Sequence, residues 1–220
     1  TPSAPIIWDK KTNQGKCKAL IINSGNANAH TGKAGIKIID NYVNELVKKN
    51  KLNKNQILVS STGVIGEIFN PSLIINSIRK INKSTATDLI GAAESIMTTD
   101  TYPKTSIKIL KIKNINLKIY GFAKGSGMIQ PNMGTMLAYI FIECSLTKAQ
   151  LKKLIKLNIE NTFNSISVDG DTSTSDTVML FAVGSNNFYK KMNQSKVIIL
   201  ISIIIWPLMA GGLLIRTYNN

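Results

Sequence analysis

Histidine and cysteine are nearly absent from this sequence, which narrows the chemistry that the chain can perform. The 220 residues include one histidine, His30, and two cysteines, Cys17 and Cys144. Neither cysteine has a partner in a CxxC or CxxH pattern, so a disulfide framework and a zinc site have little support. A catalytic triad would depend wholly on His30. This cysteine usage fits a reducing compartment, and we expect a cytoplasmic protein.

Acidic residues are also scarce, and this leaves the chain strongly basic. Twelve acidic residues stand against 27 basic ones, which gives a net charge of +15 with histidine neutral. A charge of this size suggests nucleic-acid binding. However, only two of the cations are arginine, and the lysines are scattered with few aromatic residues between them. Ile, Lys and Asn are abundant and have A/T-rich codons, which accounts for the charge without such a partner. We predict no nucleic-acid binding.

Motifs for phosphate and metal binding are missing as well. The sequence has no GxxxxGK[ST] loop and no strand-linked GxGxxG motif. Asp169, Asp171 and Asp176 lie in the segment VDGDTSTSD, but the glycine and the terminal glutamate of a calcium loop are not at the required places. We therefore predict a solvated turn here, no metal site and no resident cofactor.

Residues 1–185 alternate short apolar runs with amphipathic segments, which is typical of a mixed fold. Asn70 and Pro71 suit a helix start, as do Thr147 and Gln150, which form a capping-box pattern. We predict strands at 18–23, 56–60, 136–144 and 177–183, a hairpin over 107–120, and helices at 33–50, 70–80, 87–97 and 147–159. Helices grouped between runs of strands indicate an α+β sandwich with helices packed outside central sheets.

The two ends of the chain differ from this pattern. Residues 197–215 carry no charge and are long enough to span a membrane, although Pro207 interrupts them. The alternatives are a membrane anchor, a buried segment, or the aberrant end of a truncated reading frame. We expect one domain over 1–194 and an apolar divergent tail over 195–220. The N-terminus lacks the features of a signal peptide and begins without Met, so we expect a fragment or a processed product.

Three polar, glycine-rich clusters each follow an apolar run: 23–32, 60–66 and 124–136. Each cluster by itself is typical of a tight turn, although exposed N–H groups in such loops can bind an oxyanion. In the third cluster, Gly134 and Thr135 directly precede a predicted buried strand. This position suits a threonine nucleophile that cuts its own peptide bond and then uses its freed α-amine as base. The amine has a reference pKa of about 7.7–8.0, so it can act near neutral pH without histidine.

Five segments resemble the ornithine acetyltransferase family, the bifunctional glutamate N-acetyltransferases of arginine biosynthesis. They occur in the order and spacing of that family and span residues 18 to 184. The segments are SGNANAHTG, SSTGVIG, MTTDTYPK, KGSGMIQPNMGTMLAYI and SVDGDTSTSDTVML. The resemblance implies a self-processing sandwich of the α+β class with a threonine nucleophile.

The resemblance also implies where the chain is cut and what it transfers. Cleavage between Gly134 and Thr135 would give an α-chain part, 1–134, and a β-chain part, 135–194. Thr135 would take an acetyl group from N-acetylornithine, or from acetyl-CoA as a donor substrate, and pass it to glutamate. Two α and two β chains would associate as a heterotetramer.

The remaining site residues follow from the same motifs. Thr62 and Gly63 match the pair that stabilises the oxyanion. Thr101 and Lys124 match substrate-binding positions, as does Thr135 itself. A lysine is suited to an amino-acid carboxylate, and the alternative for Lys124 is a solvated surface lysine.

The sequence departs from the family pattern in three respects, which keep other functions open. The family has an additional N-terminal segment before the region that matches Ile6. Gly134 stands where the family usually has alanine. Beyond Gly184, the acidic substrate-binding residue and the C-terminal Asn and Ser/Thr pair of the family are not recognisable. The alternatives are therefore an inactive truncated remnant, a membrane-tethered binding module, or an amidase or aminopeptidase of the related self-processing fold, with water as the acyl acceptor.

Overall fold

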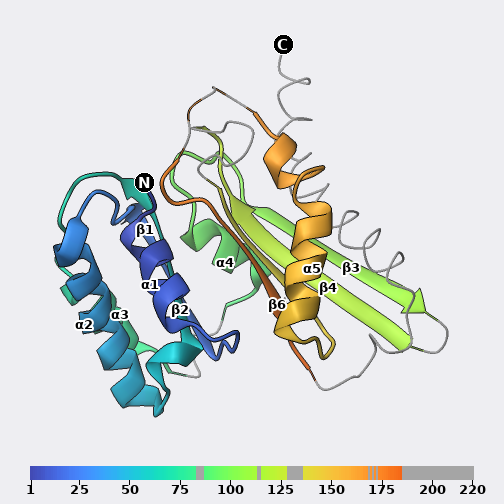
Figure 1. Cartoon of the computed structure of the whole chain (residues 1–220), viewed down its shortest axis with the longest axis horizontal. Helices are drawn as coiled ribbons and strands as arrows, with labels where there is room; N and C mark the ends of the chain where they lie inside the picture. The colour runs from blue at the N-terminus through green and yellow to red at the C-terminus, as the bar shows by residue number, and fades with distance from the viewer. Residues whose placement is uncertain are drawn as a thin grey trace. The chain divides into compact units, whose positions relative to one another are not determined.

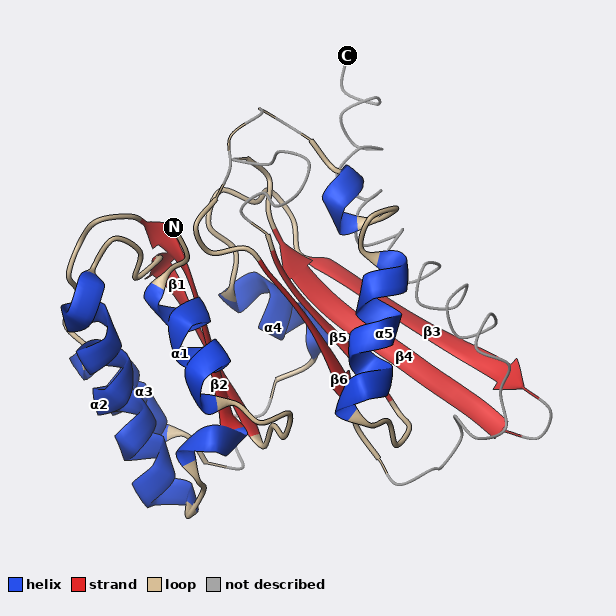
Figure 2. Ribbon diagram, in the orientation of Figure 1, coloured by secondary structure: helices blue, strands red, loops and turns tan. Residues whose placement is uncertain are grey.

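The computed structural model describes residues 1–82, 87–112, 115–127, 136–167, 169, 171 and 173–184. These residues belong to two compact units, Thr1–Asp88 and Leu89–Asn220, which are described separately below (Figures 1 and 2). The predicted cleavage residues Gly134 and Thr135 lie outside the described residues, and so does the apolar run 197–215. The predicted boundary at residue 194 stays a prediction for the same reason. No described helix combines the length and hydropathy that a membrane span requires.

The first unit packs helices against a pair of parallel strands. Strand β1 pairs with β2 in a register that runs from Ala19 opposite Ile57 to Asn26 opposite Val64. The core contains Trp8, Ile39, Tyr42 and other apolar side chains of three helices and β2. The elements are α1 (Ala4–Thr12), β1 (Ala19–Asn26), α2 (Gly32–Asn50), the 3-10 helix η1 (Lys54–Gln56), β2 (Ile57–Val64) and α3 (Ser72–Lys80).

All four predicted elements of this unit, two strands and two helices, are confirmed with shifted ends. Both strands run further than predicted, because each continues through a polar, glycine-containing segment that pairs with its partner. Helix α3 begins at Ser72, with Pro71 at the N-cap where Asn70 was predicted; the N–H of Ser72 donates to the Asn70 side chain at 2.9 Å. Helix α1 was not predicted from the apolar pattern. Its signal is a proline in the first turn, after Ser3 at the N-cap.

The second unit is a four-stranded sheet in the order β3-β4-β5-β6. The first three strands are antiparallel neighbours, and β6 runs parallel to β5. Figure 2 shows α5 lying across one face of this sheet, where Leu154 joins Ile119, Ile140 and Leu180 in the core. The elements are α4 (Leu89–Ser95), β3 (Lys104–Ile112), β4 (Ile115–Lys124), β5 (Leu137–Ile142), α5 (Lys148–Asn158), the 3-10 helix η3 (Phe163–Ser165) and β6 (Thr177–Ala182).

The helices and strands predicted for this unit are confirmed in type, although some of their ends differ. The hairpin is β3–β4, and strands β5 and β6 lie where apolar runs predicted them. The capping box forms: the N–H of Thr147 donates to Gln150 Oε1 at 2.8 Å, and the N–H of Gln150 donates to Thr147 Oγ1 at 3.3 Å. Helix α4 is shorter than predicted. Each unit combines a sheet with helices packed on it, which is the α+β class that the sequence indicates.

Candidate active site

Thr62 and Gly63, the predicted oxyanion pair, lie near the end of β2. The prediction of a loop here is wrong, because Ser24 pairs with Thr62 and Gly25 with Gly63 in the parallel ladder. Thr62 is completely buried, at 0% exposure. Gly63 has φ of +125°, and a Cβ atom at this position would overlap the backbone of Gly25. Glycine is therefore required at position 63 by both its φ angle and the close approach of the neighbouring strand.

The first glycine-rich cluster, 23–32, has a structural role in the same unit. Asn28 is buried in a left-handed conformation; its amide donates to the carbonyl of Gly35 at 3.1 Å and accepts from Thr31 Oγ1 at 2.7 Å. A backbone hydrogen bond joins this cluster to the second glycine-rich cluster, 60–66: the N–H of Ala27 donates to the carbonyl of Val64 at 2.8 Å. The motif fixes the start of α2 beside the end of β2, while His30 is exposed.

Lys124, the predicted carboxylate-binding lysine, ends β4 on the sheet face opposite α5. The alternative of a solvated surface lysine is wrong, because Lys124 is only 3% exposed. Its ammonium group donates to Thr98 Oγ1 at 2.6 Å and lies 4.0 Å from Asp100 Oδ2. Burial lowers the pKa of Lys124, and the nearby carboxylate of Asp100 opposes that shift.

Asp100 is the centre of this cluster, and the sequence did not single it out. Its Oδ1 accepts from Lys104 Nζ and from the N–H of Gly125, both at 2.7 Å. Its Oδ2 accepts from the N–H of Thr98 at 3.3 Å. Burial raises the pKa of Asp100, but the hydrogen bonds from Lys104 and the two amides outweigh it and hold that pKa below its usual value. Asp100 is therefore ionised at neutral pH.

Three consecutive residues of the MTTDTYPK motif thus bind three residues at the end of β4. Thr98 contacts Lys124 and Asp100 contacts Gly125, while the hydroxyls of Thr99 and Ser126 lie 2.8 Å apart. Two motifs that are separate in sequence therefore form one cluster. Thr101, a predicted substrate-binding residue, follows directly and is exposed. The cluster holds two lysines and one carboxylate, so it carries a net positive charge that suits a carboxylate ligand.

Asp176 is the second residue whose role the sequence did not reveal. The prediction of a solvated turn is wrong at this end of VDGDTSTSD, because Asp176 is only 7% exposed. Its Oδ1 accepts from the N–H of Met136 at 3.0 Å. Burial raises its pKa to about 6, and the hydrogen bond from Met136 limits the rise. Met136 follows Thr135 directly in the chain. Within the described ranges, no three His, Cys, Asp or Glu side chains are grouped to hold a metal ion.

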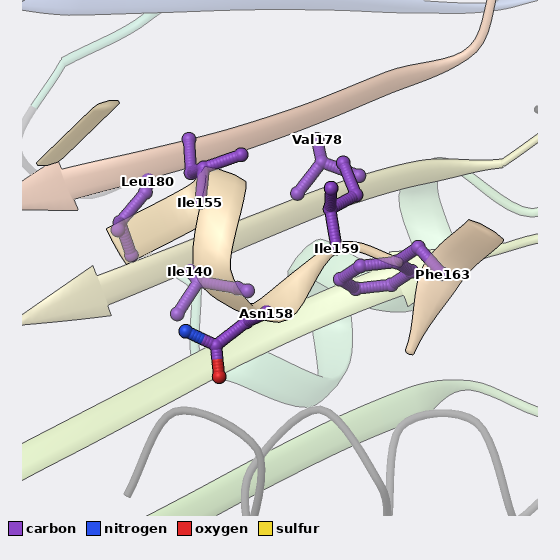
Figure 3. Close-up of a pocket in the computed structure, with 7 residues that line it drawn as sticks. All are labelled: Ile140, Ile155, Asn158, Ile159, Phe163, Val178 and Leu180. Carbon is purple, nitrogen blue, oxygen red and sulfur yellow. The ribbon is translucent and has the colours of Figure 1, made fainter. Parts of the chain in front are cut away.

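A small pocket between α5 and the sheet belongs to the core. Figure 3 shows Ile140, Ile155 and Phe163 among the side chains that line it. The polar residue of the lining, Asn158, donates to the carbonyl of Leu154 within its own helix at 2.7 Å. An apolar space of this kind has no group that would recognise an amino acid, so the Asp100 cluster is the better candidate site.

The fold and these motifs define a class of α+β proteins in which a threonine follows a glycine-rich segment. Comparison with known proteins identifies the family. The ArgJ family matches residues 1–201. The chain belongs to the ArgJ family.

Relatives and a solved structure agree with this family. The chain is similar to the arginine biosynthesis bifunctional protein ArgJ of Bradyrhizobium diazoefficiens, with 41% identity over 186 residues, 84% of this chain and 45% of the relative. The ArgJ protein of Bartonella henselae is 39% identical over 189 residues, 85% of this chain and 46% of its own. This chain therefore spans about half the length of these curated relatives. The crystal structure of the ArgJ protein of Bacillus halodurans superposes with a TM-score of 0.54 at 33% identity, over 61% of this chain and 71% of that one.

Proposed function

We propose that this chain carries the threonine nucleophile of an acetyltransferase of arginine biosynthesis, which moves acetyl from N-acetylornithine to glutamate. The observation that carries the proposal is the buried cluster of Lys124, Asp100 and Lys104. These three groups carry two positive charges and one negative charge, and a positively charged cluster attracts a carboxylate. N-acetylornithine and glutamate each carry an α-carboxylate. Exposed Thr101 beside the cluster is proposed as a further substrate contact.

The first proposed step is self-cleavage. The hydroxyl of Thr135 attacks the carbonyl carbon of Gly134, and the C–N bond between the two residues breaks as the amine takes a proton. Water then hydrolyses the resulting ester, which leaves a carboxylate on Gly134 and a free hydroxyl and α-amine on Thr135. Gly134 keeps a small residue where the family usually has alanine, which supports this step.

The second proposed step is acetyl transfer through Thr135. Its hydroxyl oxygen attacks the acetyl carbon of N-acetylornithine, the amide bond breaks, and ornithine leaves with the proton. The amine of glutamate then attacks the acetyl-threonine ester and regenerates the hydroxyl. We assign oxyanion stabilisation to Thr62 and Gly63 from the resemblance to the family; the backbone of Gly63, which requires glycine, supports that role. The α-amine of Thr135 serves as base.

The proposal extends to partners and to the compartment. Acetyl-CoA is a second acetyl donor, and no resident cofactor is needed for either transfer. The α and β parts stay associated, as a heterotetramer of two of each, and the enzyme acts in the cytoplasm.

Intact-mass measurement of the purified full chain tests the proposal. We expect two fragments that end at Gly134 and begin at Thr135, and the second fragment gains one acetyl group after brief exposure to N-acetylornithine. Added glutamate should remove that acetyl group and yield N-acetylglutamate. Release of free acetate without N-acetylglutamate would instead identify an amidase of the related fold. A single uncut chain would contradict the proposal.

A further inference from the structure

Lys104 and Lys124 approach the two oxygens of one buried carboxylate. The ammonium group of Lys104 donates to Asp100 Oδ1 at 2.7 Å. The ammonium group of Lys124 lies 4.0 Å from Asp100 Oδ2 and donates to Thr98 Oγ1 at 2.6 Å. The side chain of Asp100 is fully buried, and those of Lys104 and Lys124 are 9% and 3% exposed. Water screens such charges little, so the position of each ammonium group depends on the other two groups.

The two lysines begin on opposite faces of the β3–β4 hairpin. Lys104 starts β3 directly opposite Ala123, which belongs to the core beneath α5. Residues that are directly opposite share a face of the sheet, whereas successive residues of a strand alternate between faces. Lys124, the next residue of β4, therefore lies on the other face. A ligand that binds Lys124 on that face is not on the side of Lys104, which favours an indirect role for Lys104 through Asp100.

The electrostatics of the three groups agree with these distances. Burial raises the pKa of Asp100, and the hydrogen bond from Lys104 is the largest of the effects that lower it. Burial lowers the pKa of Lys124; Asp100 opposes that shift, and the like charge of Lys104 adds to it. Lys104 is thus the main cationic partner of Asp100, and it is close enough to Lys124 for their charges to repel.

We propose that Lys104 is a positioning residue that directs Lys124 toward Thr98 and the substrate carboxylate rather than into an ion pair with Asp100. This inference rests on the function proposed above, in which Lys124 binds that carboxylate. Without the charge of Lys104, Lys124 is the one cation within 4.0 Å of Asp100 in the described part of the chain. A movement of its ammonium group by about 1 Å would bring it within hydrogen-bond distance of Oδ2. A buried carboxylate that has lost its partner strongly favours such a pair.

An ion pair between Lys124 and Asp100 would weaken substrate binding. The substrate carboxylate would have to compete with Asp100 for one ammonium group, and two carboxylates at one cation repel each other. Lys104 prevents this competition because it holds Asp100 from the other side. It contacts no substrate atom and takes part in no covalent step, so its removal should change KM rather than kcat.

Removal of Lys104, alone and together with the charge of Asp100, tests the proposal. Lys104→Met keeps most of the length of the side chain and loses the charge. Its KM for N-acetylornithine should rise about 5- to 50-fold, because Lys124 loses part of a charge-assisted bond, while kcat stays the same. In the double variant Lys104→Met/Asp100→Asn no competing carboxylate remains, so KM should return to within about threefold of the unmutated value. Asp100→Asn alone completes the cycle of variants.

Two further variants separate positioning from general loss of structure. Lys104→Arg keeps a charged donor for Asp100, and its KM should stay within about threefold of the unmutated value. Lys108→Met removes an exposed lysine from the same strand and is the matched control, with KM and kcat unchanged. Urea unfolding of each variant checks that the fold persists. Where Lys104→Met does not fold, Lys104→Gln, which also lacks the charge, takes its place.

Binding of L-ornithine, measured by calorimetry on the same variants, gives a second measurement that needs no turnover. L-ornithine carries the same α-carboxylate and has no acetyl group to transfer. Its Kd should follow the pattern expected for KM: weaker binding in Lys104→Met and recovery in the double variant.

The outcomes separate this inference from the proposed function. An unmutated chain that binds L-ornithine but transfers no acetyl group would overturn the proposed function, and the Kd values would still decide this inference. A chain that does neither would overturn both. Equal Kd and KM in Lys104→Met and the unmutated chain would overturn the inference alone. Binding as weak in the double variant as in Lys104→Met would also overturn it, because Asp100 would then not be the competitor.

Discussion

The ammonium group of Lys124 donates a 2.6 Å hydrogen bond to the hydroxyl of Thr98. This bond holds the lysine head group at the end of β4. Thr101, which is exposed, lies three residues after Thr98 in the chain. Asp100 completes the arrangement, because its carboxylate binds backbone amides on both sides of the cluster. A lysine held in this way has lost its rotamer freedom before any ligand arrives, which reduces the entropic cost of binding a carboxylate.

Replacing Lys124 should weaken substrate binding more than self-cleavage. Lys124→Met removes the charge that would bind the α-carboxylate, and a charge-assisted hydrogen bond contributes roughly 1.5–3 kcal/mol, so KM for N-acetylornithine should rise about 10- to 150-fold. Cleavage at Gly134 involves no external carboxylate and should change little. Lys118→Met, at a half-buried lysine of the same strand, is the control. An unchanged KM in an active Lys124→Met preparation would remove Lys124 from the substrate site.

Replacing Asp100 should affect both pH dependence and stability. Asp100 raises the pKa of Lys124, so Asp100→Asn should lower that pKa further, and the alkaline loss of kcat/KM should move to lower pH. The pKa of Asp100 is itself lowered by folding. Its contribution to stability is therefore present above the pKa of the unfolded chain and is lost as pH falls through the folded value. Urea unfolding at pH 7 and pH 3 should show that the difference in unfolding free energy between the unmutated chain and Asp100→Asn becomes smaller at acid pH. Glu94→Gln, at an exposed residue of α4, is the control.

The sequence predicts those parts of the fold that depend on local pattern. The β3–β4 hairpin follows from alternating Ile and Lys, and the start of α5 follows from Thr147 and Gln150. The lysine and glycine motifs also indicate the candidate site through their resemblance to a family.

The sequence does not predict effects that arise from tertiary pairing. Glycines and serines weaken a strand in isolation, yet Thr62 and Gly63 extend β2 because Ser24 and Gly25 of β1 satisfy their backbone. Lys124 is buried because Asp100, on a distant loop, lies beside it. Asp176 has the sequence of a polar turn and becomes buried only where β6 meets β5.

Gly63 should tolerate alanine less well than its partner Gly25. Both have positive φ, +125° and +111°, so alanine at either position strains the backbone by about 1–3 kcal/mol. At Gly25 a Cβ would meet open space, whereas at Gly63 it would overlap the backbone of Gly25. Gly63→Ala should therefore destabilise the first unit more than Gly25→Ala, measured as protection of β2 amides against hydrogen exchange. Equal losses would show that the overlap is relieved by a small backbone shift.

The stability of the first unit should fall as pH rises through neutrality. Burial raises the pKa of Asp9 to about 7, and its hydrogen bond from the Val59 N–H, at 3.0 Å, limits the rise. A carboxyl whose pKa is raised by folding stabilises below its unfolded pKa, near 4, and loses that contribution as pH rises through about 7. The loss in the free energy of unfolding that Asp9 causes over this pH range is at most about 4 kcal/mol.

Hydrogen exchange of the Val59 amide measures this effect locally. The protection factor, corrected for the intrinsic rate at each pH, should decrease between pH 5 and pH 8 in the unmutated chain. Asp9→Asn keeps the acceptor for Val59 and removes the titration, so its protection factor should stay constant. A decrease of the same size in Asp9→Asn would assign the pH dependence to another group.

The nucleophile assignment makes the most direct prediction, because Thr135 would perform both proposed reactions. Thr135→Ala lacks the hydroxyl, so we expect one uncut chain and no acetyl transfer. Thr135→Ser keeps the hydroxyl and, after cleavage, the α-amine, and it should therefore cut itself and transfer acetyl at a reduced rate. Intact mass before and after exposure to N-acetylornithine measures both properties in one sample. Thr62→Ala tests the oxyanion assignment in the same assay. Loss of one oxyanion donor costs about 2.7–4 kcal/mol in other enzymes. This variant should therefore slow acetyl transfer about 100- to 1,000-fold, while Thr135 still carries the acetyl group. Cleavage that persisted in Thr135→Ala would show that another residue attacks the chain, and the proposed mechanism would then be wrong at its first step.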